Sequence, residues 1–177
     1  MRRWNGWGDE QFNLELPAQG QSFLADRVGA GKPLSDVSLE SVCAKVTETR
    51  LPVDAAVAKF IDTSAEARVR HARGQSLPDW LAMRSGDIGV FPDGVARPES
   101  SLDVQKLLQY AQAGNIELIP YGGGTSVAGH INPLASDRPV LTVDMGGMNR
   151  LIDLDRESQI ATFGAGTPGP LVESQLR

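Results

Sequence analysis

The sequence is poor in the residues that build disulfides and metal sites. It holds one cysteine, Cys43, and two histidines, His71 and His130. One cysteine excludes an internal disulfide and a zinc site built on cysteines, and two histidines far apart in the chain are poor material for another metal centre. We therefore predict no metal site, and a reducing compartment, the cytoplasm, as the location.

The sequence also lacks an excess of basic residues, and it lacks long apolar runs. The 17 Lys and Arg against 22 Asp and Glu give a net charge of −5, so we expect no surface for nucleic acid. No apolar run approaches the roughly 20 residues that cross a bilayer. The stretch WNGWGDEQFN after Arg3 is not the apolar core of a signal peptide. With 177 residues, 41% of them hydrophobic, the chain is long enough to bury a core.

The pattern of elements changes near residue 88. Residues 1–87 predict a mostly helical region, in which helices are expected to begin at Ser35 or Ser38, at Pro52, at Ser64 and at Pro78. Val53, Ala56, Val57 and Phe60 recur at helical spacing after Pro52.

The region after residue 88 mixes strands with one clear helix. A strand at 95–98 is followed by a helix from Ser100 to Gly114, with Asp103 completing a capping box and Leu107, Leu108 and Ala111 on its apolar face. IELIPY, RPVLTVDM, RLIDLD and SQIATFGAG then predict strands. Runs of helices followed by such a mixture indicate an α+β fold.

The most informative stretch is PYGGGTSVAG, residues 120–129. Three consecutive glycines remove every Cβ from one side of a turn and make positive φ available. Successive N–H groups in such a turn can bind an anion such as a pyrophosphate. A Walker loop would need a lysine after the glycines, and a Rossmann loop would open a helix; neither follows. The residues alone leave both a tight turn and a ligand-binding loop open.

A second candidate feature is the cluster Arg68, Arg70, His71 and Arg73 in the predicted third helix. These side chains either form a solvated basic face or point towards an anionic ligand.

The glycine loop and its neighbours resemble a known family. PYGGGTSVAG is similar to the pyrophosphate loop of the FAD-binding domain shared by vanillyl-alcohol oxidase and p-cresol methylhydroxylase (PCMH-type). VARPESSLDVQKLLQYAQAGNIELIPYGGGTS resembles that domain's opening strand, helix and strand, and TVDMGGMNRLIDLDRESQIATFGAGTPGPLVESQL resembles the segment after the loop. RRWNGWGDEQF and RGQSLPDWLAMRSGDIGVFPDGVARP look most like the alkyldihydroxyacetonephosphate synthase branch.

This resemblance implies a fold and a cofactor. Residues 1–87 would be the helical N-terminal region, and residues 88–177 the first lobe of a PCMH-type FAD-binding domain, truncated at its C-terminal end. FAD would be bound non-covalently, because Gly124 and Thr125 stand where relatives attach it to a histidine. Carried over residue by residue, the family's contacts with FAD fall on Pro120, Tyr121, Gly122, Gly123, Gly124, Thr125 and Ser126.

The resemblance also implies a reaction. Enzymes of the synthase branch exchange the acyl group of acyl-dihydroxyacetone phosphate for a long-chain alcohol through a flavin N5 adduct, in ether lipid synthesis. Their catalytic residues would lie downstream of residue 177, so we expect these 177 residues alone to be catalytically silent. Two alternatives stay open: an FAD-linked dehydrogenase of 2-hydroxy acids such as D-lactate or glycolate, and a non-catalytic structural module.

The partners follow from the same resemblance. We expect a small-molecule or lipid-like substrate, peripheral membrane contact confined to the downstream part, and either a monomer or a homodimer.

Overall fold

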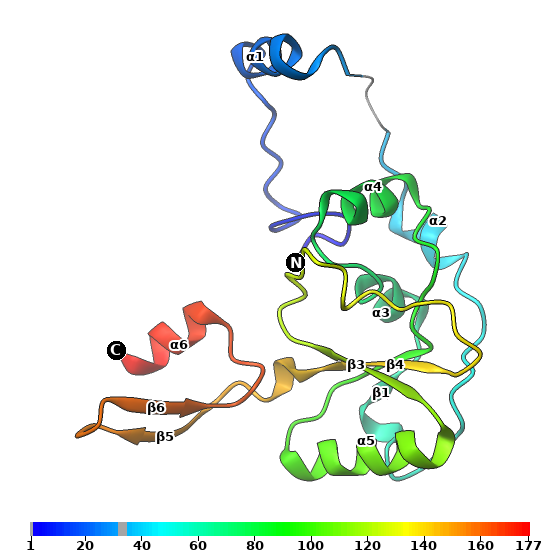
Figure 1. Cartoon of the computed structure of the whole chain (residues 1–177), viewed down its shortest axis with the longest axis vertical. Coiled ribbons are helices and arrows are strands. Elements are labelled where there is room, and N and C mark those ends of the chain that lie inside the picture. Colours follow the sequence, from blue (N-terminus) through cyan, green and yellow to red (C-terminus); the bar gives the residue numbers. More distant parts are fainter. Residues whose placement is uncertain (1, 32–34) are drawn as a thin grey trace.

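A four-stranded sheet in the order β1–β2–β4–β3 organises the chain (Figure 1). The structure is a computed structural model that describes residues 2–31 and 35–177. Strands β2, β4 and β3 run parallel, and β1 pairs antiparallel with β2 at one edge. The bounds are β1 (Ile61–Asp62), β2 (Gly94–Ala96), β3 (Glu117–Tyr121) and β4 (Val140–Asp144). The predicted α+β class is confirmed.

Helix α5 (Ser101–Gly114) connects β2 to β3 across one face of the sheet. The predicted N-terminus is confirmed, because the Ser100 hydroxyl accepts a hydrogen bond from the Asp103 amide at 3.2 Å. Asn115 ends the helix with a left-handed backbone, φ 50°, a conformation that asparagine tolerates better than most residues.

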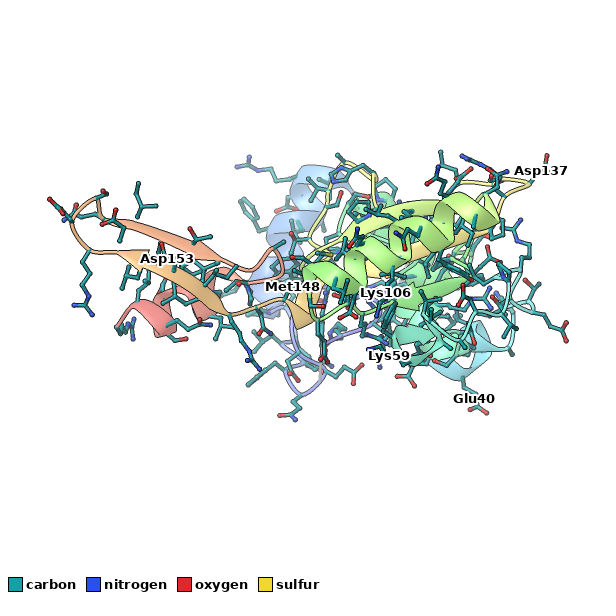
Figure 2. The ribbon with its side chains drawn as sticks, turned by 90° about the horizontal axis from the view of Figure 1, so that it is seen from below. Glu40, Lys59, Lys106, Asp137, Met148 and Asp153 are labelled. Carbon is teal, nitrogen blue, oxygen red and sulfur yellow. The ribbon has the colours of Figure 1, made fainter. Side chains whose placement is uncertain are left out.

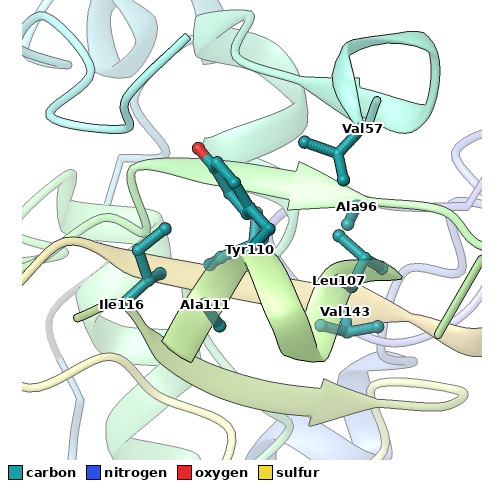
Figure 3. Packing of buried hydrophobic residues seen from close by; sticks show 8 residues of the cluster. Val57, Ala96, Leu107, Tyr110, Ala111, Ile116 and Val143 are labelled. Carbon is teal, nitrogen blue, oxygen red and sulfur yellow. The ribbon is translucent and has the colours of Figure 1, made fainter. Parts of the chain in front are cut away.

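One face of α5 builds the larger hydrophobic core (Figure 3). Leu107, Tyr110 and Ala111 pack with Val57 and with residues of β2 and β4. The prediction that Leu108 shares this face is wrong: its side chain is 56% exposed, because each residue turns about 100° from the one before it.

Three short helices lie on the side of the sheet opposite α5 (Figure 1). They surround a second apolar cluster that contains Val42, Val69 and Met83. They are α2 (Leu39–Cys43), α3 (Ala65–Arg70) and α4 (Leu77–Ser85). Each begins after a serine whose side chain accepts an amide hydrogen bond: Ser38, Ser64 and Ser76. The helix starts predicted at Ser38 and Ser64 are confirmed, and α4 begins with Pro78 in its first turn.

The helix predicted from Pro52 is wrong. The chain forms a turn in which the Asp54 carboxylate accepts the Ala56 amide at 2.8 Å, then one 3-10 turn, η1 (Ala58–Phe60), and strand β1. Pairing of Ile61 with Ala96 in the sheet outweighs the weak helical preference of the stretch, and Val53 is fully exposed.

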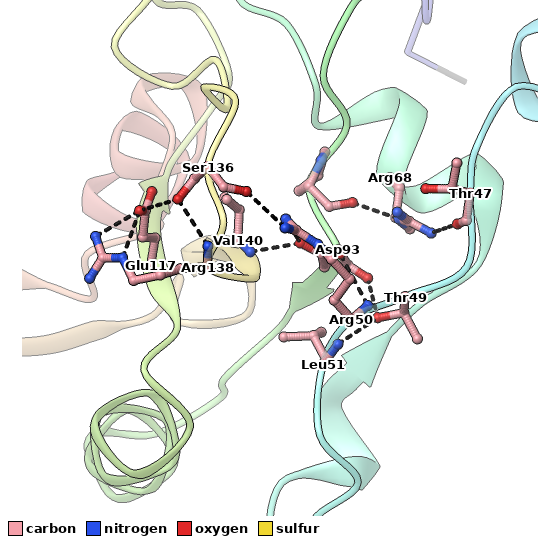
Figure 4. A network of polar contacts seen from close by, with 11 residues as sticks. Thr47, Thr49, Arg50, Leu51, Arg68, Asp93, Glu117, Ser136, Arg138 and Val140 are labelled. Atoms are coloured by element: carbon pink, nitrogen blue, oxygen red, sulfur yellow. Dashed lines mark hydrogen bonds and ion pairs between the residues drawn. The ribbon is translucent and has the colours of Figure 1, made fainter.

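A buried aspartate joins the N-terminal region to the sheet (Figure 4). Asp93, 2% exposed, accepts hydrogen bonds from the Arg50 guanidinium at 2.7 and 3.0 Å and from the Val140 amide at 2.8 Å. Burial raises the pKa of Asp93, but the hydrogen bonds from Arg50 and the Val140 amide outweigh it, so the pKa lies below its usual value. Asp93 thus fixes the starts of β2 and β4 to the 47–51 segment.

The last elements form an arm that projects beyond Met148 (Figure 2). It consists of the antiparallel pair β5 (Leu151–Asp155) and β6 (Ile160–Phe163), followed by α6 (Gly169–Leu176). The predicted strands in RLIDLD and SQIATFGAG are therefore confirmed. Ile152 and Ile160 are more than half exposed on this arm.

Helix α1 (Ala18–Val28) stands away from the sheet and buries none of its residues. Within the described residues, no helix combines the length and apolarity needed to cross a membrane.

Candidate functional site

The glycine loop leaves the sheet at the carboxyl end of β3. Tyr121, the last residue of β3, pairs in register with Asp144, the last residue of the parallel strand β4. Both strands therefore end at one edge of the sheet, with the loop starting beside the Asp144 carboxylate. Ligands of open parallel sheets bind outside this carboxyl edge.

The first two loop glycines are open to an approaching ligand. A Cβ added at Gly122 would meet no atom within 4 Å, and one at Gly123 would meet only the Thr125 methyl, at 3.5 Å. None of the backbone amides of residues 122–126 donates a hydrogen bond to another residue that the structure describes. Space and unused N–H donors together fit the pyrophosphate of a dinucleotide.

Gly124 has a different role. Its φ is +66°, and a Cβ there would overlap the Tyr121 hydroxyl and come within 2.8 Å of the Arg2 guanidinium. Only a residue without a side chain fits this position.

We therefore expect Gly124→Ala to lower the free energy of unfolding by about 1–3 kcal/mol, the cost of a strained left-handed residue. Gly122→Ala, with ordinary φ and open space, is the matched control and should change it little or raise it by up to about 1 kcal/mol. Urea denaturation of both variants measures the difference; equal stabilities would contradict this role of Gly124.

Arg2 holds the loop from its carbonyl side. Its guanidinium donates to the Gly123 carbonyl at 2.6 Å and to the Gly124 carbonyl at 3.3 Å. Sequence reasoning missed Arg2, because no spacing rule connects residues 121 positions apart. The contact adds one positive charge beside a loop whose own residues carry none.

The second half of the loop is fixed to the turn between α3 and α4. The Gln75 amide donates to the Ser126 carbonyl at 2.6 Å, and a side chain at Gly74 would overlap that carbonyl. Asn132 accepts from the Gly74 amide at 2.9 Å and donates to buried Asp79 at 2.7 Å. The loop is thus anchored at both ends while residues 122–123 stay open.

Buried His71 pairs with the partly buried Asp144 at the point where the loop begins. His71 Nε2 lies 3.0 Å from Asp144 Oδ2, its Nδ1 lies 2.7 Å from the Ala67 carbonyl oxygen, and its ring lies 4.6 Å from the Tyr121 ring. Burial raises the pKa of Asp144, but hydrogen bonds from His71 and the Gly146 amide outweigh it and hold that pKa below its usual value. Burial also raises the pKa of Tyr121.

The lowered pKa of Asp144 makes the site sensitive to acid. Its contribution is complete above the ordinary aspartate pKa of about 4 and is lost as the pH falls through the folded-state pKa. We expect the free energy of unfolding to fall less steeply between about pH 5 and pH 2 in Asp144→Asn than in the unsubstituted chain. Urea titrations across this range test it; parallel slopes would show that Asp144 contributes nothing to acid lability.

The cations of α3 and the turn after it do not form the predicted basic face. Arg68 is buried and donates to the carbonyls of Pro92 at 2.6 Å and Thr47 at 2.7 Å. His71 is buried as well. The hypothesis of a solvated basic face is therefore wrong for these two residues. Arg70 pairs with Glu66 at 2.8 Å. Arg73 donates to the Ile88 carbonyl at 2.9 Å. These guanidinium groups bind the chain's own oxygens. Arg70 and Arg73 also line a cavity of about 230 Å³ that reaches Gly122, so the anion-binding hypothesis stays a prediction for these two residues.

His130 lies near the loop's end, with Nδ1 3.4 Å from the Ser126 hydroxyl. The described residues contain no cluster of three or more His, Cys, Asp or Glu side chains that could hold a metal ion.

The strand–helix–strand unit β2–α5–β3 leads into an open glycine loop at the carboxyl edge of the sheet, where ligands of open α/β sheets bind. Residues 92–177 match the FAD binding domain family, and this segment belongs to it.

Over nearly its whole length the chain is similar to alkyldihydroxyacetonephosphate synthases. It is 30% identical over 208 residues to that of Trypanosoma brucei brucei, covering 98% of this chain and 33% of the relative. It is 36% identical over 110 residues to that of Dictyostelium discoideum, covering 62% and 18%. A solved structure of such a synthase matches with a TM-score of 0.83 at 26% identity, covering 99% of this chain and 38% of the other. The chain thus spans about a third of the length of the trypanosome relative and less than a fifth of the Dictyostelium relative.

Proposed function

We propose that this chain is the FAD-binding part of a flavoenzyme of the alkyldihydroxyacetonephosphate synthase type. In the reaction, an acyl group leaves the dihydroxyacetone phosphate as a carboxylate and a long-chain alcohol takes its place, with no net oxidation. The observation that supports it best is the pair of open glycines with unused amides, within a chain similar to such synthases along 98% of its length.

The residues that would hold the cofactor are those of the loop. The amides of Gly122 to Ser126 would donate to its pyrophosphate, and the hydroxyls of Thr125 and Ser126 would add two further donors. Arg2 would contribute charge from the carbonyl side. When bound, FAD supplies the isoalloxazine at which the exchange takes place; the 177 residues offer the binding and orientation of its phosphates.

Amide NMR of the 177-residue chain tests this proposal without any need for turnover. Inorganic pyrophosphate and ADP should each shift the amide signals of residues 122–126 and leave those of the β5–β6 arm in place. Shifts spread over the surface, or none at the loop, would contradict it. Bleaching of bound flavin by D-lactate in the full-length protein would favour the 2-hydroxy-acid dehydrogenase instead, and lack of any flavin would favour a structural module.

We further expect the flavin to be held non-covalently. Residues 120–129 include no histidine or cysteine, and Gly124 and Thr125 stand where relatives carry the histidine that attaches FAD. Acid precipitation of the full-length flavoenzyme should therefore release all of its yellow colour into the supernatant. Flavin that stays with the pellet would show a covalent bond.

A further inference from the structure

The N-terminal residues form a turn that is anchored beside the glycine loop. Arg2 and Asp9 make an isolated antiparallel bridge, and the Arg3 amide donates to the Gly8 carbonyl at 2.9 Å. The Arg2 guanidinium joins this turn to the carbonyls of Gly123 and Gly124. Figure 1 shows the start of the chain next to the segment that follows β3.

A cavity of about 270 Å³ lies between this turn and the loop. Gly6, Trp7 and Gly8 line one side of it, and Gly123 and Thr125 line the other. The cavity therefore opens onto the same glycine that leaves its amide and its Cβ space unused.

The two tryptophans of the turn are used in different ways. Trp4 is partly buried and packs against the cluster around Val42 and Met83. Trp7 is 63% exposed, so folding of the described chain leaves most of its indole without a partner. The neighbouring Gly8 has nothing within 4 Å of its Cβ position, which keeps the approach to the ring clear.

We propose that Trp7 is the stacking surface for a heteroaromatic ring of the dinucleotide whose phosphates lie on the glycine loop. This inference rests on the proposed function. Aromatic side chains bind flat bases through stacking, which needs no particular pattern of hydrogen bonds. One ligand with phosphates at Gly122 and Gly123 and a flat ring at Trp7 would use both the unused amides and the exposed indole.

The test compares probes with and without a ring on the 177-residue chain. Inorganic pyrophosphate carries the phosphates alone, ADP adds adenine, and FMN carries the isoalloxazine. The variants are Trp7→Leu, Trp7→Phe, and the control Phe12→Leu, which alters an aromatic of the same segment that is 73% exposed and does not line the cavity. Urea denaturation of each variant confirms that it is folded.

We expect Trp7→Leu to weaken the ring-bearing probe about tenfold, with pyrophosphate unchanged, and Trp7→Phe to restore most of the affinity. The probe that responds, ADP or FMN, identifies which ring is stacked, and it should also quench tryptophan fluorescence in the unsubstituted chain.

If Trp7→Leu weakens the binding of pyrophosphate and ADP equally, Trp7 only shapes the loop. If all affinities stay unchanged, Trp7 is a surface residue with no contact to the ligand. Either result overturns the stacking role while the proposed function stands. If the unsubstituted chain binds none of the three probes, the proposed function fails and the stacking role fails with it.

Discussion

Replacing Gly123 with valine is expected to abolish pyrophosphate and ADP binding while leaving the chain folded. The branched side chain would occupy the space beside the unused amides where a phosphate oxygen must approach. The fold should tolerate it, since a Cβ there meets only the Thr125 methyl at ordinary contact distance, 3.5 Å. The φ of Gly123 is not positive, so loss of binding would come from blocked space and not from backbone strain.

Isothermal titration of ADP into Gly123→Val, with urea denaturation alongside, measures both halves of this expectation. Gly31→Val is the matched control, because Gly31 also has open space and lies far from the loop in sequence. Unchanged ADP affinity in Gly123→Val would refute the assignment of the loop as the phosphate site. A large loss of stability would instead show that position 123 is structural.

Asp93→Ala is expected to destabilise the sheet region strongly. It would leave the Val140 amide and part of the Arg50 guanidinium without their acceptor. Breaking a fully buried ion pair costs about 3–5 kcal/mol; Arg50 is 44% exposed and can recover water, so we expect a loss of about 2–4 kcal/mol in the free energy of unfolding.

Asp153→Ala, which removes an exposed aspartate of β5, is the control and should change stability by less than about 0.5 kcal/mol. Asp93→Asn keeps the shape and one acceptor oxygen and should fall between the two. Similar urea midpoints for Asp93→Ala and Asp153→Ala would show that the network in Figure 4 contributes no net stability.

Local signals made much of the sheet region predictable from the sequence. The Ser100–Asp103 box, the spacing of Leu107 and Ala111, and the glycines after Tyr121 each act within a few residues, and the structure has the predicted helix, strand and loop there. The prediction of a helix after Pro52 failed because the apolar spacing of this segment fits a helix, whereas the pairing of Ile61 with β2 decides its structure.

Most of the loop's supports could not be predicted in this way. Arg2, Gln75 and Asn132 reach the loop or its anchoring turn through contacts that join distant parts of the chain. The assignment of FAD contacts to Pro120 and the six residues after it remains a prediction, which the Gly123 and amide experiments address.

The strand order also has a consequence for folding kinetics. Strand β4 lies between β2 and β3, yet it is the last of the four to be synthesised. Neither β2 nor β3 has its parallel neighbour until the ribosome has delivered the chain through Asp144. The 18 residues between Tyr121 and Val140 must then close on themselves, and the entropy of closing a loop grows slowly with its length. The glycine loop belongs to this connection, and the backbone bond from Gln75 to Ser126 ties it to the turn between α3 and α4. We therefore expect the sheet to be completed only after this connection has closed.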